Sequence, residues 1–329
     1  MTRPEQPEPF LRGCVHPDAP GVPYPRAKPD GPMTRIPVDT WTMASIPAGV
    51  RLEFDGDAAA IEIEYECAHE SFGYLGGGEG HEFVVLRDGA VTDRQGAQVG
   101  EHTVRLEARG SGPGVVHLPE RMGPTITSIS GSDGELVPGP VGPRWLCYGD
   151  SIAEGWCVTS PERAWPAVAA RTLGLDVVNL GYAGSSRGEI PSAEELADLD
   201  ADVISIAHGT NCWTRTPHSA ELFAVNLGVF LDIVRQGHPD TPIVAISPIT
   251  RPDAETTENR LGTTLTDLRA AFEQVVGERI EAGDARLTLV EGLPIVTPEQ
   301  LTDDIHPGDE GHTAMADVIG PALAAALGR

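Results

Sequence analysis

The sequence WLCYGDS, residues 145–151, places a serine at the end of a short apolar run. Consecutive apolar residues of this kind are typical of a buried strand in a parallel sheet. Side chains that follow such a strand lie at its carboxyl end, where open α/β sheets bind their ligands. We therefore expect Ser151 to lie in a binding site, where it is a candidate nucleophile.

Residues 143–329 alternate short apolar segments with amphipathic ones. Buried strands separated by helices indicate a parallel sheet that is covered on both faces. The expected fold class for this part is α/β, with three layers and a flavodoxin-like sheet. The predicted strands are 145–148, 176–179, 203–207, 243–247 and 287–291, and the predicted helices are near 162–172, 194–199, 219–236, 264–280 and 312–327.

The first half of the chain has a pattern typical of antiparallel strands. Short segments alternate apolar and polar residues at 50–54, 61–65, 83–86 and 103–106. Turn-rich stretches separate these segments, and the glycine run at 76–80 fits a hairpin turn because no phosphate-loop lysine follows it. The pattern predicts an all-β sandwich or jelly-roll domain over residues 1–142, with about the first 30 residues irregular. The prolines and glycines of 139–143 predict a linker to the domain at 143–329.

The sequence DDIHP, residues 303–307, supplies the groups that would activate a serine. A serine hydroxyl is a weak nucleophile, so an imidazole must accept its proton and a carboxylate must orient that imidazole. His306 is the candidate base, and Asp303 or Asp304 is the candidate carboxylate. Together with Ser151, these residues predict a site for nucleophilic catalysis.

Four sequence blocks occur in a recognisable order: GDS at 149–151, NLGYAG at 179–184, GTN at 209–211 and DDIHP at 303–307. In these blocks the chain resembles the SGNH, or GDSL, hydrolase superfamily, whose members carry Ser, Gly, Asn and His in four separate blocks. The resemblance covers about residues 143 to 329 and nothing before them. The preceding β-rich half matches the two-domain type of this superfamily, in which a β-sandwich precedes the catalytic domain.

The resemblance implies a role for individual residues. Ser151 would be the nucleophile and His306 the general base, and the family spacing favours Asp303 over Asp304 as the acid that orients His306. The oxyanion would be bound by the backbone amides of Ser151 and Gly184 and by the side chain of Asn211.

Two alternative readings of nearby residues are weaker. The sequence GSSRG at 184–188 matches the G-x-S-x-G nucleophile elbow and would make Ser186 the nucleophile. That motif requires a strand directly before the serine and a helix directly after it, whereas here the predicted strand ends at residue 179 and Pro191 interrupts the segment after the serine. His312 is expected to be a structural histidine, and no metal or other cofactor is expected because no further His or Cys cluster accompanies Asp303, His306 and His312.

Side chains close to the blocks are candidates for substrate binding. Trp156 and Trp213 could wall an acyl or aromatic pocket, and core packing is the alternative for both. Arg187 and Arg215 could bind a carboxylate of the substrate, although solvent exposure is the commoner fate of an arginine.

The composition limits the classes of partner. The formal charge of −26 comes from 49 acidic and 23 basic residues, and such an excess disfavours nucleic acid and anionic membranes as partners. No apolar run is long enough to span a bilayer, and the N-terminal residues lack the apolar stretch of a secretory signal, so a cytoplasmic location is expected. The five cysteines are scattered and are expected to be small buried side chains rather than a disulfide framework.

Three functions remain open at the level of sequence. The first is a carboxylic ester hydrolase that acts on a small-molecule acyl ester through an acyl-Ser151 intermediate. The second is an acyltransferase that gives the same acyl group to an alcohol of a sugar or a natural product, as in superfamily members that tailor natural products, including one of two-domain type in tetracycline biosynthesis. The third is a non-catalytic carbohydrate-binding protein, which is disfavoured because every triad and oxyanion position is filled. Three roles are open for the β-rich half: it could bind carbohydrate, form one wall of the substrate cleft, or act only as a packing partner of the second half.

Overall fold

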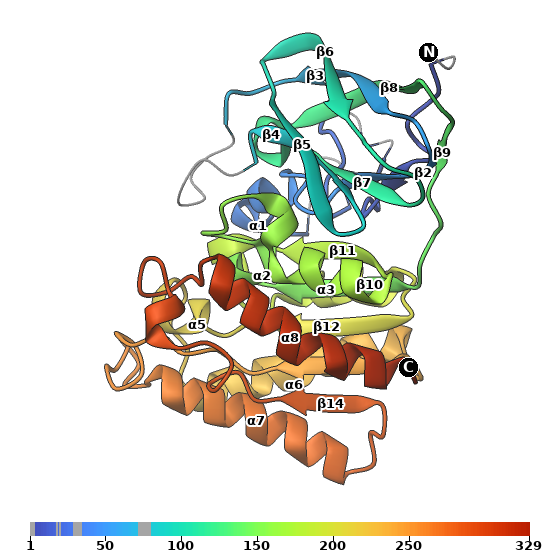
Figure 1. Ribbon diagram of the computed structural model, residues 1–329. Helices are drawn as coiled ribbons and strands as arrows, with labels where there is room; N and C mark the ends of the chain where they lie inside the picture. The colour runs from blue at the N-terminus through green and yellow to red at the C-terminus, as the bar shows by residue number, and fades with distance from the viewer. Residues whose placement is uncertain (1–3, 18, 20, 29–34, 72–79) are drawn as a thin grey trace.

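The computed structural model describes residues 4–17, 19, 21–28, 35–71 and 80–329. These residues form two antiparallel sheets in the first half of the chain and one parallel sheet in the second (Figure 1). The protein therefore has the predicted class, an α/β domain preceded by a β domain. The glycine run predicted as a turn lies outside the described residues except for Gly80.

The parallel sheet has five strands in the order β11-β10-β12-β13-β14. In chain order this is 2-1-3-4-5, the order of flavodoxin-like folds. All five strands were predicted to within two residues at either end, because each is a short and almost wholly apolar segment. The strands are β10 (Arg144–Gly149), β11 (Asp176–Gly181), β12 (Val203–Ala207), β13 (Ile243–Ile246) and β14 (Leu287–Val290).

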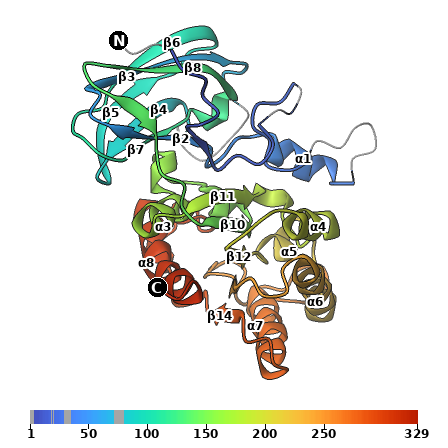
Figure 2. The same ribbon diagram turned by 90° about the vertical axis from the view of Figure 1, so that its right-hand side faces the viewer.

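Helices cover both faces of this sheet and complete the three layers (Figure 2). One face packs against α4 (Ile190–Asp198), α6 (Ala220–Gly237) and α7 (Leu265–Glu281). The other face packs against α3 (Trp165–Leu173) and α8 (Asp309–Ala326). The remaining helices are short: α1 (Val38–Ala44), α2 (Ser151–Glu154), α5 (Asn211–Thr214) and the 3-10 turns η1 (Glu120–Met122), η2 (Pro161–Arg163), η3 (Ala183–Ser185) and η4 (Pro298–Gln300).

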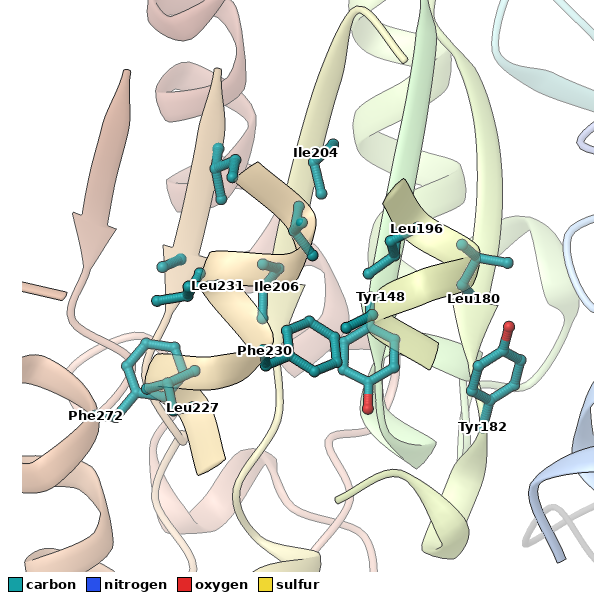
Figure 3. Close-up of a cluster of buried hydrophobic side chains, with 14 of the residues drawn as sticks. Tyr148, Leu180, Tyr182, Leu196, Ile204, Ile206, Leu227, Phe230, Leu231 and Phe272 are labelled. Atoms are coloured by element: carbon teal, nitrogen blue, oxygen red, sulfur yellow. The ribbon is translucent and has the colours of Figure 1, made fainter. Parts of the chain in front are cut away.

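The alternation of side chains along the strands builds two separate cores. Leu146 and Tyr148 of β10 belong to the core beneath α4, α6 and α7, whereas Trp145 and Cys147 belong to the core beneath α3 and α8. Figure 3 shows the first of these cores, in which the ring of Phe230 lies 4.8 Å from that of Tyr148 between centroids. Because consecutive side chains of a strand point to opposite faces, a continuous apolar run is required where both faces are buried.

The β domain contains two antiparallel sheets that share one hydrophobic core. The larger sheet has the order β1-β2-β7-β4-β5, with β9 paired to β2, and the smaller has the order β6-β3-β8. The core takes Phe54 from the larger sheet and Ile63 from the smaller. The strands are β1 (Leu11–Arg12), β2 (Arg51–Gly56), β3 (Ala60–Cys67), β4 (Glu82–Arg87), β5 (Ala90–Gly96), β6 (Gly100–Glu107), β7 (Gly114–His117), β8 (Pro124–Ser132) and β9 (Leu136–Pro138).

The sequence predicted β2, β3, β4 and β6 but not the other strands of this domain. β5 is an edge strand with no buried residue, so its sequence carries no apolar alternation. β8 is rich in serine and threonine, and β7 is only four residues long. Burial pattern alone therefore revealed only the strands with a clear apolar face.

The N-terminal segment does not belong to the β domain alone. Ala27, Ile36 and Ala44 are buried in the core of the α/β domain beneath α4 and α6. Arg26 is 1% exposed and donates hydrogen bonds to Asn179 O at the edge of the parallel sheet and to Met43 O. The predicted division at residue 142 falls between β9 and β10 and stays a prediction, since the chain before it contacts both domains.

Two further expectations concern the whole chain. In the part of the chain that the structure describes, no helix combines the length and apolar character needed to cross a membrane. None of the five cysteines, all of which lie in described residues, forms a disulfide bond, and Cys67, Cys147, Cys157 and Cys212 are buried. Burial raises the pKa of the Cys147 thiol to about 12, which makes it unreactive at neutral pH.

Candidate active site

Ser151 lies at the first position of α2, immediately after β10. The turn between strand and helix is tight, because a Cβ atom on Gly149 would lie 2.5 Å from Ala153 Cβ and 2.8 Å from Ala207 O. Asp150 caps the short helix by accepting a hydrogen bond from Ile152 N at 3.0 Å. The middle residue of the GDS block therefore shapes the turn that presents the serine.

A chain of two hydrogen bonds joins Ser151 to His306 and Asp303. Ser151 Oγ lies 2.7 Å from His306 Nε2, and His306 Nδ1 lies 2.8 Å from Asp303 Oδ2. The other oxygen, Asp303 Oδ1, accepts a hydrogen bond from His306 N at 2.8 Å. Asp303, and not the neighbouring exposed Asp304, therefore contacts the imidazole.

The charge on Asp303 favours one tautomer of His306. Burial raises the pKa of Asp303, but hydrogen bonds from the His306 ring and from backbone amides outweigh this effect and lower the pKa below its ordinary value. An ionised carboxylate can only accept a hydrogen bond, so it favours the tautomer in which Nδ1 carries the proton and donates it. The lone pair of Nε2 then faces the hydroxyl of Ser151, which is the arrangement that a general base requires.

Gly184 and Asn211 lie on the loops after β11 and β12. Gly184 lies in η3, and Asn211 begins α5. Asn211 Nδ2 donates hydrogen bonds to Ala183 O at 2.9 Å and to Ser186 O at 3.0 Å. The side chain of Asn211 thus holds in place the turn that carries the Gly184 amide.

Trp156 connects the histidine to the β domain. Its ring stacks on His306, with 5.3 Å between the centroids and 30° between the planes. The guanidinium carbon of Arg121, from η1 of the β domain, lies 6.0 Å from the centroid of Trp156. Arg121 Nη2 also donates to Glu154 Oε1 at 3.2 Å, and Glu154 ends the helix that begins with Ser151. Arg121 of the first half of the chain therefore contacts both the tryptophan that stacks on His306 and the helix that begins with Ser151.

The other candidate binding residues differ in their contacts. Arg187 forms an ion pair with Asp39, with 2.7 Å between Nη1 and Oδ2. Trp213 packs under the guanidinium of Arg251 at 4.8 Å, and its indole nitrogen donates to Thr257 O. Arg215 is exposed, and its guanidinium lies against Gly184, where a Cβ atom would be 3.1 Å from Arg215 Nε.

The alternative nucleophile and the second histidine lie in structural positions. Ser186 is fully buried, and β11 ends at Gly181, so the strand of a nucleophile elbow does not lead into it. His312 is also fully buried, with Nδ1 accepting from Trp165 N and Nε2 donating to Trp156 O. Burial lowers the pKa of His312 to about 4, so the ring is a neutral bridge between two segments.

Among the described residues, one group could offer ligands to a metal ion. Cys157, Asp303 and His306 have ligand atoms within 4.8 Å of one another, and His312 is not part of this group. Two of these residues already form the chain to Ser151. A metal on His306 would have to displace one of those hydrogen bonds.

The sequence did not indicate Arg121, Glu154 or Arg26 as part of the site. Glu154 is 3% exposed and lies close to both arginines, with 3.7 Å to Arg26 Nη2. The signal in the sequence was an acid within the mainly apolar stretch IAEGW, residues 152–156, one turn after Ser151. An acid that is buried there needs a cationic partner. Its partners lie far away in the sequence, so their identity could not be predicted.

The chain belongs to the GDSL-like Lipase/Acylhydrolase family, whose pattern matches residues 147–314. With this family assignment and the first relative below, the protein is an ester hydrolase or an acyltransferase. Among curated proteins, no sequence matches this chain.

Solved structures extend the likeness over both domains. The salicylyl-acyltransferase SsfX3 from a tetracycline biosynthetic pathway is 27% identical, with a TM-score of 0.81 over 98% of this chain and 97% of that one. A putative GDSL-like lipase from Bacteroides ovatus is 21% identical, with a TM-score of 0.81 over 99% of this chain and 98% of that one. A family two carbohydrate esterase from Clostridium thermocellum, in complex with cellohexaose, is 17% identical, with a TM-score of 0.65 over 85% of this chain and 93% of that one. The last two structures are less than 25% identical to this chain, so their likeness shows a shared fold and not a shared function.

The buried Asp150 makes the stability of the protein depend on pH. Burial raises the pKa of Asp150 to about 7 from the ordinary value of 3.8, so the folded state binds more protons than the unfolded state between these values. The contribution of Asp150 to stability is therefore complete below pH 3.8 and is lost as the pH rises through about 7. Asn at position 150 can still cap the helix but does not titrate. We therefore expect Asp150→Asn to remove the part of the fall in stability with rising pH that is due to Asp150.

Urea unfolding between pH 5 and pH 8 would measure the effect, which is at most about 1.4 kcal/mol per pH unit. The exposed Asp304→Asn is the matched control. Parallel pH profiles for wild type and Asp150→Asn would contradict the assignment.

Proposed function

We propose that the protein is a serine-dependent carboxylic ester hydrolase that acts on a small-molecule acyl ester. The observation that carries this proposal is the continuous contact from Ser151 Oγ to His306 Nε2 and from His306 Nδ1 to Asp303. These three groups at these distances are the arrangement that activates a hydroxyl for attack on an acyl carbon. No cofactor takes part in the proposed reaction.

The first half-reaction forms an acyl-enzyme. Ser151 Oγ attacks the carbonyl carbon, and its proton passes to His306 Nε2. The tetrahedral intermediate collapses when the bond to the alcohol oxygen breaks, and His306 returns the proton to that oxygen. Asp303 stays ionised and stabilises the imidazolium that exists between these two transfers.

The second half-reaction releases the acyl group. His306 Nε2 accepts a proton from a water molecule, whose oxygen attacks the acyl carbon. The bond to Ser151 Oγ then breaks, the proton returns to this oxygen, and the carboxylic acid leaves.

The proposed oxyanion donors are the amides of Ser151 and Gly184 and the side chain of Asn211. The two Asn211 donor contacts are to the carbonyl oxygens of Ala183, in the η3 turn, and of Ser186, which directly follows it. Donation to the oxyanion would replace one of these contacts, while the other would keep the turn in place. Loss of one such donor typically lowers kcat by about a hundredfold or more.

We assign the β domain, residues 1–142, a supporting role for the catalytic domain, residues 143–329. Arg121 lies over Trp156, whose ring in turn lies on His306. Trp156 is therefore a candidate wall of the acyl site that the β domain holds in place. Trp213 is a weaker candidate, because its ring lies against Arg251 and its indole nitrogen donates to Thr257 O, and neither contact is with His306.

The identity of the nucleophile can be tested with two serine variants. We expect a fluorophosphonate to label wild-type protein at Ser151 in equimolar amount, and Ser151→Ala to lose labelling and esterase activity. Ser186→Ala is the matched control, because Ser186 is buried and lies outside the hydrogen-bonded chain. Mass spectrometry of the labelled peptide gives the position, and an active Ser151→Ala protein would refute the mechanism.

Transfer of the acyl group to an alcohol is the second candidate function. The observation that favours it is the likeness to the salicylyl-acyltransferase SsfX3, which extends over 98% of this chain at 27% identity. The residues proposed for hydrolysis would also serve transfer, with an alcohol in place of water. A carbohydrate or a natural product is then the proposed acceptor, and the charge of −26 disfavours nucleic acid and anionic membranes as partners.

Product analysis separates these functions. We expect p-nitrophenyl acetate to give p-nitrophenol and acetate in equal amounts when water is the acceptor. With added sugars and phenols, a transferase would convert part of the acetate into a new ester, which liquid chromatography with mass spectrometry detects. Release of neither product by wild-type protein would favour the third candidate, a binding module without catalysis.

Arg215 is the better candidate than Arg187 for a carboxylate on the substrate. Arg187 is already paired with Asp39, whereas Arg215 lies exposed against Gly184 of the proposed oxyanion site. A carboxylate near the reacting carbonyl would gain a charge-assisted hydrogen bond from Arg215.

We expect Arg215→Met to lower the ratio of kcat/KM for p-nitrophenyl succinate to that for p-nitrophenyl butyrate by about tenfold. Arg187→Met should change this ratio less, and the exposed Arg260→Met should not change it. An unchanged ratio in Arg215→Met would exclude this role for Arg215.

A further inference from the structure

A cavity of about 630 Å³ lies between the β domain and the α/β domain, apart from the hydroxyl of Ser151. Strands β2, β4 and β7 line it from one side, and α3 and β11 line it from the other. These are the elements that face each other where the two domains meet in Figure 1. A volume of this size is typical of small-molecule sites.

Strand register places three basic side chains, Arg51, His117 and Arg94, on one face of the larger β-domain sheet, and Arg51 and His117 line the cavity. Arg51 pairs with His117, His117 pairs with Val84, and Val84 pairs with Arg94. Residues opposite one another on paired strands point to the same face of the sheet. The two arginines are bound to the α/β domain, since Arg51 forms an ion pair with Asp176 and Arg94 with Glu162.

His117, the third of these side chains, has no such partner. It is 3% exposed and lines the cavity, and among the described residues its ring makes no hydrogen bond. Burial and the charges of Arg171, Arg51 and Arg94 hold the pKa of His117 well below its ordinary value. The neutral ring therefore offers one donor and one acceptor to whatever enters the cavity. A buried polar group without a partner is costly, and a bound ligand would remove that cost.

Arg171 of α3 also lines the cavity. Its Nη1 donates to two backbone carbonyls, Glu162 O at 3.1 Å and Ala167 O at 3.4 Å. Within the described ranges it forms no ion pair with a carboxylate, and its other nitrogens have no hydrogen-bond partner. Burial lowers its pKa somewhat, but an arginine stays charged at neutral pH. The nearest charge acting on Arg171 is the carboxylate of Glu162, which raises its pKa but is itself paired with Arg94. Among the described residues, the half-buried guanidinium of Arg171 is therefore a cation in the cavity wall without an ion pair of its own, in a protein whose net charge is −26.

The carboxylates that line the cavity do not neutralise Arg171. Glu53 pairs with Arg51 at 2.7 Å, and Glu154 pairs with Arg121 at 3.2 Å. Glu120 accepts a hydrogen bond from Gly49 N at 2.8 Å. Asp88 is exposed on a turn. Each of these groups is therefore already engaged or in contact with water.

The rest of the wall is mainly apolar. Its side chains include Phe54, Leu86, Val115, Ala167, Ala170 and Leu175. Gly89, Val141 and Thr172 are exposed lining residues, so the cavity reaches the surface. An apolar chamber with one unpaired cation and one free donor fits a ligand with an anionic head and an apolar body.

We propose that this cavity is a second ligand site, which binds a small monocarboxylate through Arg171 and His117 and holds its apolar body between α3 and the β-domain sheet. The carboxylate would accept hydrogen bonds from the Arg171 guanidinium and from the protonated ring nitrogen of His117. A carboxylic acid is also the product of the proposed hydrolysis. The test therefore has to separate the cavity from the catalytic site.

Calorimetric titration of full-length Ser151→Ala protein with octanoate tests the proposal without any turnover. We expect octanoate to bind. Octanamide, which has the same chain but no charge, should bind at least about tenfold more weakly. Arg171→Met should weaken octanoate binding by about tenfold or more, and Arg171→Lys should retain part of it. Arg260→Met, the loss of an exposed arginine in the same domain, should have no effect.

A filled cavity locates the binding without changing any charge. Ala167→Phe places a ring in the cavity and should abolish octanoate binding, while circular dichroism verifies that each variant is folded. Octanoate affinity that is equal in Ala167→Phe and in the parent would place the ligand elsewhere, including the catalytic site, and would overturn the proposal. Absence of octanoate binding, or equal binding of octanamide, would overturn it as well. Failure of the proposed function would appear instead as an active Ser151→Ala protein.

Discussion

The free edge of the parallel sheet at β11 is the constraint on which the arrangement of the whole molecule depends. Among the described residues, β11 pairs with β10 on one side only, and its other side presents backbone carbonyls to which no strand is paired. Arg51 Nη1 donates to Val177 O at 3.0 Å, and Arg26 Nη1 donates to Asn179 O at 3.1 Å and also to Gly181 O. Side chains from the first half of the chain thus take the place of a sixth strand.

This way of covering an edge has two consequences for the site. It brings the β domain close enough for Arg121 to reach Trp156 and Glu154, which flank His306 and Ser151. It also leaves a space beside α3, because two sheets and a helix joined by a few arginines do not interdigitate as a continuous core does. The support of the catalytic residues and the cavity therefore have the same origin.

Much of the α/β domain could be predicted because its signals are local. A strand buried on both faces needs a continuous apolar run, and each of the five strands has one. Ser151, Asp303 and His306 were identified from two short blocks, and the structure joins them by hydrogen bonds. The β domain was less predictable, since its edge strand β5 buries no residue and so carries no periodic signal.

The sequence by itself determined the class of the fold, the strands of the parallel sheet and the residues able to form a serine, histidine and aspartate chain. Each of these follows from neighbouring residues, whose burial pattern or spacing is a local property. Only the tertiary structure decided that Arg187 is paired with Asp39, that Arg121 supports Trp156 and that His117 and Arg171 share a cavity. Those contacts join segments that are far apart in the chain. They form because arginines of the first half of the chain bind the free edge of β11, and no pattern of neighbouring residues predicts such long-range contacts.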